Sequence, residues 1–157
     1  MTGAITVRPA EPGRDTAALV GLRWLWGLEK GRAPVGSAEP SPEFAARFAT
    51  WLAANTSTHT AFLALDGDRP VGMAWLATLE RPPDVDVPVR RSGFVQSVFV
   101  LPALRDDGIG AALLTAVVAT ARDRCLQYLL VSPSERSVPF YRRHGFTGDH
   151  RLCLPLT

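Results

Sequence analysis

The sequence predicts a mixed α/β (α+β) fold, with one central sheet and helices on both faces. Strand-like apolar runs alternate with segments of helical spacing, and a strand-helix-strand unit occupies the second half of the chain. The length of 157 residues suits one domain over residues 1–157. Because 46% of the residues are hydrophobic and 20% are charged, which is ordinary globular usage, wholesale disorder is excluded.

The first third of the chain predicts one strand and two helices. Residues 4–9 alternate apolar and polar side chains and end at a proline, which is typical of a short strand. Apolar residues recur at helical spacing over 15–30, and a second helix starts after the N-cap Ser41. Its apolar face is interpreted as core, with a substrate pocket as the alternative, for Phe44, Phe48, Trp51 and Leu52.

A hairpin and a further strand follow. Residues 60–65 and 70–79 are apolar runs joined by Asp66-Gly67-Asp68-Arg69, a strong turn signal. A charged, proline-rich loop over 80–91 separates the hairpin from a strand over 92–101. Since the hairpin is antiparallel and the next unit is parallel, we expect a mixed sheet.

The second half of the chain predicts two helices and two strands. A helix over 109–124 leads to a strand over 126–131, and the crossover between the strands at 92–131 is expected to be right-handed. A short helix over 134–144 ends at a glycine, and a last strand is expected over 146–156.

Charge, hydropathy and cysteine content exclude several classes of function. The 17 cations form no clustered basic stripe, so we expect no nucleic-acid partner. No apolar run approaches the roughly 20 residues of a membrane span, and the N-terminus lacks a signal-peptide pattern. Cys125 and Cys153 have no metal-ligand spacing, so we expect no metal and two buried free thiols in a reducing, cytoplasmic compartment.

The most informative motif, Arg105-x-x-Gly108-x-Gly110, lies between a predicted strand and a predicted helix. A turn that opens into a helix leaves several backbone N–H groups pointing at one place, where the helix dipole adds positive charge. The glycines let the backbone approach a bulky anion, and Arg105 adds a charge-assisted contact. The pattern therefore predicts a phosphate or pyrophosphate site, with a tight connection as the alternative. It matches neither a Walker loop nor a dinucleotide fingerprint.

Two segments resemble motifs of a known family. Residues 98–114, Val-Phe-Val-Leu-Pro-Ala-Leu-Arg-Asp-Asp-Gly-Ile-Gly-Ala-Ala-Leu-Leu, resemble the acetyl-CoA signature of the GNAT superfamily of N-acetyltransferases. Residues 134–146 resemble the closing motif of that family, and the strand order also fits. The resemblance covers nearly the whole chain and implies the GNAT acyl-CoA N-acyltransferase fold. In that fold the parallel strands, here 92–101 and 126–131, splay apart.

The resemblance also implies roles for individual residues. Backbone groups of Val98 and Val100 would pair with the pantetheine arm of acetyl-CoA. An N–H near Val98 or Phe99 would polarise the thioester carbonyl, and the amides of 106–111 would hold the pyrophosphate. Tyr141 would protonate the departing thiolate, with plain helix packing as its alternative. The implied cofactor-binding residues are Val98, Phe99, Val100, Arg105, Asp106, Gly108, Ile109, Gly110, Ala111, Ser134 and Ser137.

Several positions depart from the pattern of the family. Asp106 and Asp107 stand where relatives often carry Gly, Lys or Arg, and would repel a pyrophosphate unless their side chains point to solvent. Ser134 stands where many relatives have Asn, and can still cap the helix and offer a hydroxyl. Ser137 replaces a common Ala.

The general base is not evident, because the splayed strands carry no Glu of the kind that some relatives use. The polar Gln96 and Ser97 are expected to line the acceptor pocket. The acids of the preceding loop are candidates to relay a proton through water, although a solvated surface charge is the favoured interpretation of each, and water alone is the other alternative. These acids also suggest a cationic acceptor. These acids are Glu80, Asp84 and Asp86.

The leading hypothesis is an acetyl-CoA-dependent N-acetyltransferase. It would move the acetyl group to a primary amine of a small-molecule acceptor by direct attack in a ternary complex, without a covalent intermediate on Cys125. A non-catalytic acyl-CoA-binding or sensing module is the alternative, and an interaction domain without a cofactor is a third. Homodimers are frequent among relatives, so a homodimer remains one alternative for the oligomeric state.

Overall fold

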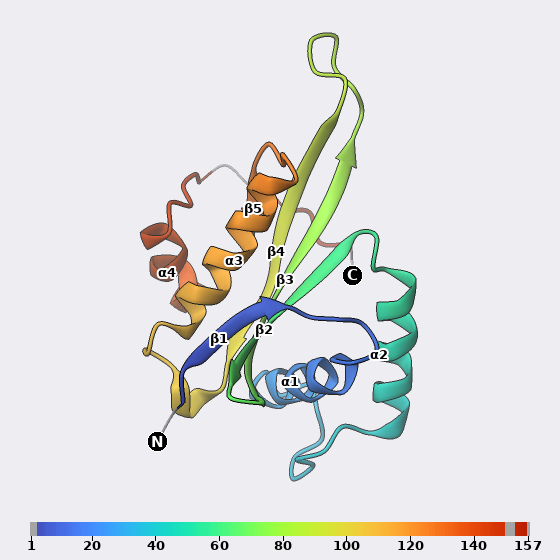
Figure 1. Cartoon of the computed structure of the whole chain (residues 1–157), viewed down its shortest axis with the longest axis vertical. Coiled ribbons are helices and arrows are strands. Elements are labelled where there is room, and N and C mark those ends of the chain that lie inside the picture. Colours follow the sequence, from blue (N-terminus) through green and yellow to red (C-terminus); the bar gives the residue numbers. More distant parts are fainter. Residues whose placement is uncertain (1–2, 150–152, 157) are drawn as a thin grey trace.

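The structure, a computed structural model, describes residues 3–149 and 153–156 (Figure 1). Within these residues, five strands form one sheet in the order β1-β2-β3-β4-β5. The strands are β1 (Ile5–Pro9), β2 (His59–Asp66), β3 (Arg69–Arg81), β4 (Arg90–Val100) and β5 (Leu129–Val131). The helices are α1 (Thr16–Glu29), α2 (Pro42–Ala54), α3 (Ile109–Asp123) and α4 (Val138–Arg143), with 3-10 turns η1 (Pro102–Leu104) and η2 (Glu135–Ser137).

The sheet is mixed, as the sequence predicts. The pairs β1–β2, β2–β3 and β3–β4 are antiparallel, and β4 pairs with β5 in parallel. Helices α3 and α4 lie on one side of the sheet, while α1 and α2 lie on the other (Figure 1). This arrangement confirms the expected α/β fold with helices on both faces.

Two apolar cores result, one on each face of the sheet. Successive residues of β2 alternate between them: Phe62 joins the cluster that contains Leu113 of α3, and Leu63 joins the cluster that contains Leu19 of α1. Neighbouring side chains of a strand point to opposite faces, so a strand buried on both sides reads as one continuous apolar run.

Local signals set the starts of the N-terminal helices. The Ser41 side chain accepts a hydrogen bond from the Phe44 N–H at 3.2 Å, which is the expected N-cap of α2. At α1, the buried Asp15 accepts bonds from Arg8 of β1 at 2.6 and 2.9 Å and from the Glu11 N–H at 2.7 Å. These bonds hold the pKa of Asp15 down at about 2 and fix α1 against the sheet.

The C-terminal prediction is wrong in two respects. Strand β5 starts only at Leu129 rather than at 126, and residues 146–149 and 153–156 form no strand. Residues 150–152 of the predicted last strand lie outside the described residues. Gly145 and Gly148 both adopt left-handed backbone angles, with φ of 89° and 108°, which break an extended chain. A strand also needs a partner ladder, and the alternating pattern alone does not supply one.

The prediction for the cysteines is also wrong, because both are exposed. Cys125 lies in the turn after α3, with a left-handed φ of 56°, and Cys153 lies in the segment that does not join the sheet. None of the helices in the described part of the chain is long and apolar enough to cross a membrane.

Candidate active site

A β-bulge interrupts β4 at its centre. Opposite β4, Met73 pairs with Phe99 whereas Trp75 pairs with Gln96, so β4 contains one extra residue over this stretch. Ser97 adopts a left-handed φ of 50°, which costs a non-glycine residue about 1 kcal/mol. The bulge therefore re-aims the backbone of β4 at the point where it leaves the core.

The two parallel strands part at this bulge. Residues 93–95 of β4 pair with 129–131 of β5, and the pairing ends there. Strand β4 continues through 96–100, where no strand of the described residues pairs with it on that side, so one edge of its backbone lies open. The Val100 carbonyl on this stretch accepts a hydrogen bond from the Arg105 Nε at 3.0 Å. The geometry agrees with the expected splay.

The turn after β4 leaves a set of backbone N–H groups unpaired. Asp106 and Gly108 adopt left-handed φ angles of 67° and 80°, and Gly108 is the N-cap of α3. The first N–H of the helix to find an acceptor is that of Ala112, which bonds to the Gly108 carbonyl at 3.0 Å. The N–H groups of 106–111 make no hydrogen bond within the described chain. They lie at the positive end of a 15-residue helix, where an anion is stabilised.

A cavity of about 770 Å³ runs along this turn and the open edge of β4. The residues that the sequence implies for cofactor binding, and Tyr141, line this cavity. They are Val98, Phe99, Val100, Arg105, Asp106, Gly108, Ile109, Gly110, Ala111, Ser134 and Ser137. Asp107 is exposed and does not line the cavity, so only one of the two aspartates borders it.

Sequence reasoning missed several cations of this cavity. Lys30, which follows α1, and Arg136 and Arg143 near α4 line it together with Trp26. The two arginines lie inside the closing motif at 134–146, so their position in that motif could have identified them as cavity residues. Two carboxylates also line the cavity, those of Glu29 and Asp106, and Glu29 is paired with Arg105. The three further cations therefore outnumber the remaining carboxylate of Asp106.

Arg105 is partly committed within the chain. Its Nη2 donates to the Glu29 carboxylate at 2.5 Å, and its guanidinium carbon lies 5.6 Å from the centre of the Phe99 ring. With the bond to Val100 described above, Arg105 ties the end of α1 to β4 and to the turn. Any contact with a bound anion uses the remaining donors of its guanidinium.

Tyr141 is 8% exposed and packs edge-on against Phe140 and Phe146, with ring centres 5.0 and 5.5 Å apart. Burial raises the pKa of its hydroxyl to about 12, so the group is protonated at neutral pH. The hydroxyl makes no hydrogen bond to a described residue, and the side chain lines the cavity. Tyr141 is therefore suited to give a proton and not to take one.

The two serines of the closing motif contact each other. The Ser137 hydroxyl donates to the Ser134 carbonyl at 3.0 Å, and the two hydroxyl oxygens also lie 3.0 Å apart. Ser134 is the N-cap of η2, but its side chain does not cap the turn as the sequence suggested. Its carbonyl instead accepts the Ser137 N–H at 3.0 Å, because the chain turns tightly there.

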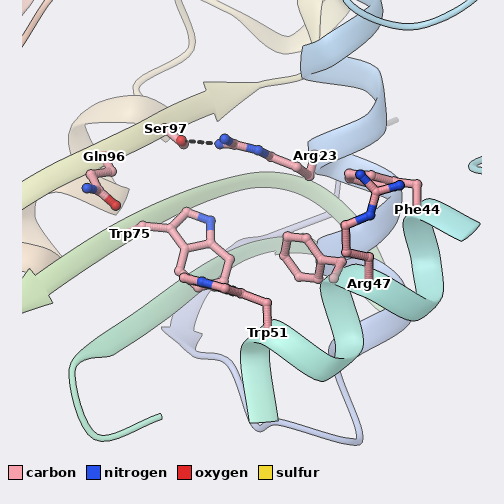
Figure 2. Close-up of a pocket in the computed structure, with 8 residues that line it drawn as sticks. Arg23, Phe44, Arg47, Trp51, Trp75, Gln96 and Ser97 are labelled. Carbon is pink, nitrogen blue, oxygen red and sulfur yellow. Dashed lines mark hydrogen bonds between the residues drawn. The ribbon is translucent and has the colours of Figure 1, made fainter. Parts of the chain in front are cut away.

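A second cavity, which we call the aromatic pocket, lies beside the bulge between the sheet and helices α1 and α2 and has a volume of about 500 Å³ (Figure 2). Gln96 and Ser97 line it as expected, and Ser97 lines the larger cavity as well. Leu52 is buried core as predicted, but the aromatic side chains of the same helix form the pocket wall. The lining residues are Arg23, Phe44, Arg47, Phe48, Trp51, Trp75, Gln96 and Ser97.

The candidate acids lie away from both cavities. Glu80, Asp84 and Asp86 belong to the long β3–β4 hairpin, which projects beyond the rest of the sheet (Figure 1), and none of them lines either cavity. Asp84 instead pairs with Arg90 of the same hairpin at 3.3 Å. His59 lines neither cavity, and burial lowers the pKa of its ring.

Comparisons with known proteins agree with this geometry. The sequence model of the Acetyltransferase (GNAT) family matches residues 21–146. Glucosamine 6-phosphate N-acetyltransferase of Trypanosoma brucei brucei is 32% identical over 62 residues, which are 40% of this chain and 42% of that protein. The chain thus matches about two fifths of the length of that curated relative.

Solved structures show the same fold. A protein described as a predicted acetyltransferase with acetyl-CoA, from Clostridium acetobutylicum, has a TM-score of 0.78 and 20% identity over 98% of this chain and 97% of that one. An aminoglycoside acetyltransferase from an uncultured soil metagenomic sample has a TM-score of 0.76 and 17% identity, over 98% and 95% of the two chains. Since the family model spans most of the sequence, the chain belongs to the GNAT acetyltransferase family.

Proposed function

We propose that the protein is an acetyl-CoA-dependent N-acetyltransferase that acetylates a primary amine of a small molecule by direct attack in a ternary complex. The observation that carries the proposal is the position of Ser97. It lies on the bulge where β4 and β5 part, and it lines both the larger cavity and the aromatic pocket. A donor in one cavity and an acceptor in the other would meet there.

The larger cavity fits acetyl-CoA, which supplies an acetyl thioester when bound. The unpaired N–H groups of 106–111 suit its pyrophosphate, and the surrounding cations suit its further negative charge. The open edge of β4 at Val98 suits the amide groups of a thin pantetheine chain, in the manner of an added strand.

Residues on both sides of the bulge would serve the transfer. An N–H of Val98 or Phe99 would polarise the thioester carbonyl. The amine nitrogen forms a bond to the acyl carbon as the carbon–sulfur bond breaks, and the protonated Tyr141 gives its proton to the departing thiolate. The attacking amine must be neutral, and the nearby cation Arg23 lowers the pKa of an amine in the pocket. Water would take the amine proton, and a proton from water would restore the neutral Tyr141 hydroxyl.

The relatives support a small-molecule amine as the acceptor. One is named as an N-acetyltransferase of glucosamine 6-phosphate, and another as an aminoglycoside acetyltransferase, so both names give a small polar molecule as the acceptor. We also propose that this protein works in the cytoplasm, since its two cysteines are exposed and free, and exposed thiols persist in reducing compartments.

Two measurements on the purified protein test the proposal. Calorimetry with acetyl-CoA is expected to show binding, and a thiol-release assay is expected to show turnover with at least one member of a panel of amines. Binding without release from any amine would assign a non-catalytic acyl-CoA-binding module. Absence of binding would leave an interaction domain.

The direct mechanism has its own test. The double variant Cys125→Ser with Cys153→Ser is expected to keep its turnover, because neither thiol lines a cavity. Loss of turnover in a folded double variant would show that a thiol carries the acetyl group and would overturn direct attack.

A further inference from the structure

The aromatic pocket carries positive charge and no carboxylate. Arg23 of α1 and Arg47 of α2 line it, and among the described residues no Asp or Glu does (Figure 2). This differs from the cationic acceptor that the acids of the 80–91 loop suggested, since those acids lie on the distant hairpin.

Neither arginine has an anionic partner in the described chain. The Arg23 guanidinium donates to the Ser97 hydroxyl and lies over the Trp26 ring at 4.3 Å, and both partners are neutral. Arg47 makes no hydrogen bond or ion pair within residues 3–149 and 153–156. Arg23 is half-buried, and a buried cation without a counter-ion is costly, so an anion that arrives with a ligand would offset that cost. Arg47 is exposed, so its guanidinium is open to an anionic ligand.

Burial already destabilises the charged form of Arg23. It is half-buried, and burial lowers the pKa of its guanidinium, with a further lowering by the charge of Arg32. A side chain destabilised as a cation by burial and by a like charge is stabilised when a negative group enters beside it.

The wall of the pocket adds a dipole of the same sign. The Nε1 of Trp75 is buried and has no hydrogen-bond partner among the described residues. Figure 2 shows this nitrogen on the edge of the indole ring that is turned toward Arg23 and Ser97. Its neighbours cover the nitrogen, so we assign it a part in the positive potential of the pocket and no direct ligand contact.

The rest of the wall is aromatic and held firmly. The Trp51 ring lies 5.7 Å from that of Trp75 and 6.1 Å from that of Phe48, while Phe48 and Trp75 lie 5.9 Å apart. Trp51 is 39% exposed, so part of its ring is available to a ligand. An apolar or aromatic body of a ligand would pack against this wall.

Together these observations identify a class of acceptor. We propose that the acceptor is a primary amine that carries an anionic group, carboxylate or phosphate, on an apolar or aromatic body. Arg47 holds the anion with the help of Arg23, the aromatic wall holds the body, and the amine lies at Ser97, where the two cavities meet. This inference rests on the function proposed above.

Matched acceptors test the charge requirement. Phenylalanine is compared with phenylalaninamide, O-phosphotyramine with tyramine, and putrescine serves as a cationic amine. For one of the two pairs, the anionic member is expected to give a kcat/KM at least about tenfold higher than its partner, the worth of one charged hydrogen bond. The two pairs distinguish a carboxylate from a phosphate.

Variants of Arg47 then test its proposed contact with the anion. Arg47→Gln is expected to raise the KM for the anionic acceptor about tenfold with little change in kcat, and Arg47→Glu is expected to abolish the preference. Arg69→Glu is the matched control, because this exposed first residue of β3 gives the same change in net charge and lines neither cavity. It is expected to keep the wild-type preference.

The outcomes separate this inference from the proposed function. If the protein acetylates putrescine or the neutral amines as well as the anionic ones, the anion requirement is wrong while the N-acetyltransferase stands. If it binds acetyl-CoA but acetylates no amine, the proposed function fails. Calorimetry with phenylalanine and with O-phosphotyramine then decides whether the pocket takes anions: binding that Arg47→Glu removes supports the assignment, and no binding overturns it.

Discussion

The two cavities that meet at Ser97 differ in the groups that line them: backbone groups in one and side chains in the other. The larger cavity presents backbone N–H groups from one short turn, 106–111, and the open edge of one strand. The aromatic pocket presents long side chains from four elements, α1, α2, β3 and β4. A glycine pattern encodes a backbone site locally, so a short stretch of sequence reveals it. A side-chain site is encoded by positions that become neighbours only on folding.

The same difference decides how each cavity responds to substitution. In the turn, the donor groups are fixed by the main chain, so a side-chain change acts through shape. In the aromatic pocket, the donors are arginines on flexible stems, so a change acts through charge. The predictions below test this contrast in order of expected size.

The largest effect is expected for Gly110→Trp. A Cβ at this position would lie 3.5 Å from the Phe140 ring, so an indole must displace that ring or fill the cavity. We expect the affinity for acetyl-CoA, measured by calorimetry, to fall about hundredfold or more, equal to about 2.7 kcal/mol. Gly110→Ala is the control, because 3.5 Å is an ordinary contact, and its affinity is expected to stay near that of the wild type. Wild-type affinity in Gly110→Trp would contradict the proposed pyrophosphate site at 106–111.

The next effect is expected for Tyr141→Phe. The change removes the hydroxyl and keeps the ring contacts with Phe140 and Phe146, so turnover falls while the cavity keeps its shape. We expect kcat to fall about a hundredfold, within the range of general acid catalysis, and the Kd for acetyl-CoA to stay unchanged. Because the pKa of Tyr141 is about 12, activity between about pH 6 and 9 follows the amine, and the variant is expected to keep the wild-type pH profile. Weaker acetyl-CoA binding with unchanged kcat would reverse this assignment.

Asp15→Asn tests the ion pair that anchors α1, the helix that contributes residues to both cavities. Helix α1 supplies Arg23 to the pocket and Glu29 to the larger cavity, and the Asp15–Arg8 pair fixes its start. The lowered pKa of Asp15 means that its ionised form stabilises the fold above about pH 4, and this contribution is lost as the pH falls through about 2.

We expect Asp15→Asn to lower the free energy of unfolding at pH 7 by about 1 to 2 kcal/mol, since Arg8 is partly exposed and solvent weakens the pair. The difference from the wild type is expected to shrink as the pH falls toward 2, as measured by denaturant unfolding. Acetyl-CoA affinity of the folded variant is expected to stay unchanged. A constant difference at every pH would remove the ion pair as the cause.

The smallest effect is expected for Arg105→Ala. Since this guanidinium already bonds to Glu29 and Val100, its loss is expected to weaken acetyl-CoA binding only about threefold, less than one charged hydrogen bond. Glu29→Gln removes the competing carboxylate, and it is expected to leave binding equal or tighter. Equal weakening by both variants in calorimetry would show that the Arg105–Glu29 pair acts only by holding α1 in place.

The sequence predicts most elements because their signals are local. Apolar spacing gives the helices, Ser41 gives an N-cap that the structure contains, and Asp66-Gly67-Asp68-Arg69 gives the hairpin turn. The turn at 106–111 is local as well, since a left-handed Gly108 at the start of α3 follows from the glycine pattern itself.

Other features required the folded chain. The alternating pattern after Gly145 predicts a strand, yet no ladder forms there in the described residues, since strand formation depends on a distant partner. The aromatic residues of α2 have the same helical spacing whether they are buried or line a pocket. Periodicity gives the face of a helix, and only packing decides what covers that face.

By itself, the sequence therefore determined the order of the elements up to α4, the mixed sheet and the glycine turn before α3, because the signals for each lie close together in the chain. The tertiary structure alone decided where β4 and β5 part and which charges meet in the aromatic pocket. Arg23 and Ser97 are 74 residues apart in sequence, yet they share a hydrogen bond in that pocket. No local pattern encodes such a contact, since it forms only when α1 packs across the bulge of β4.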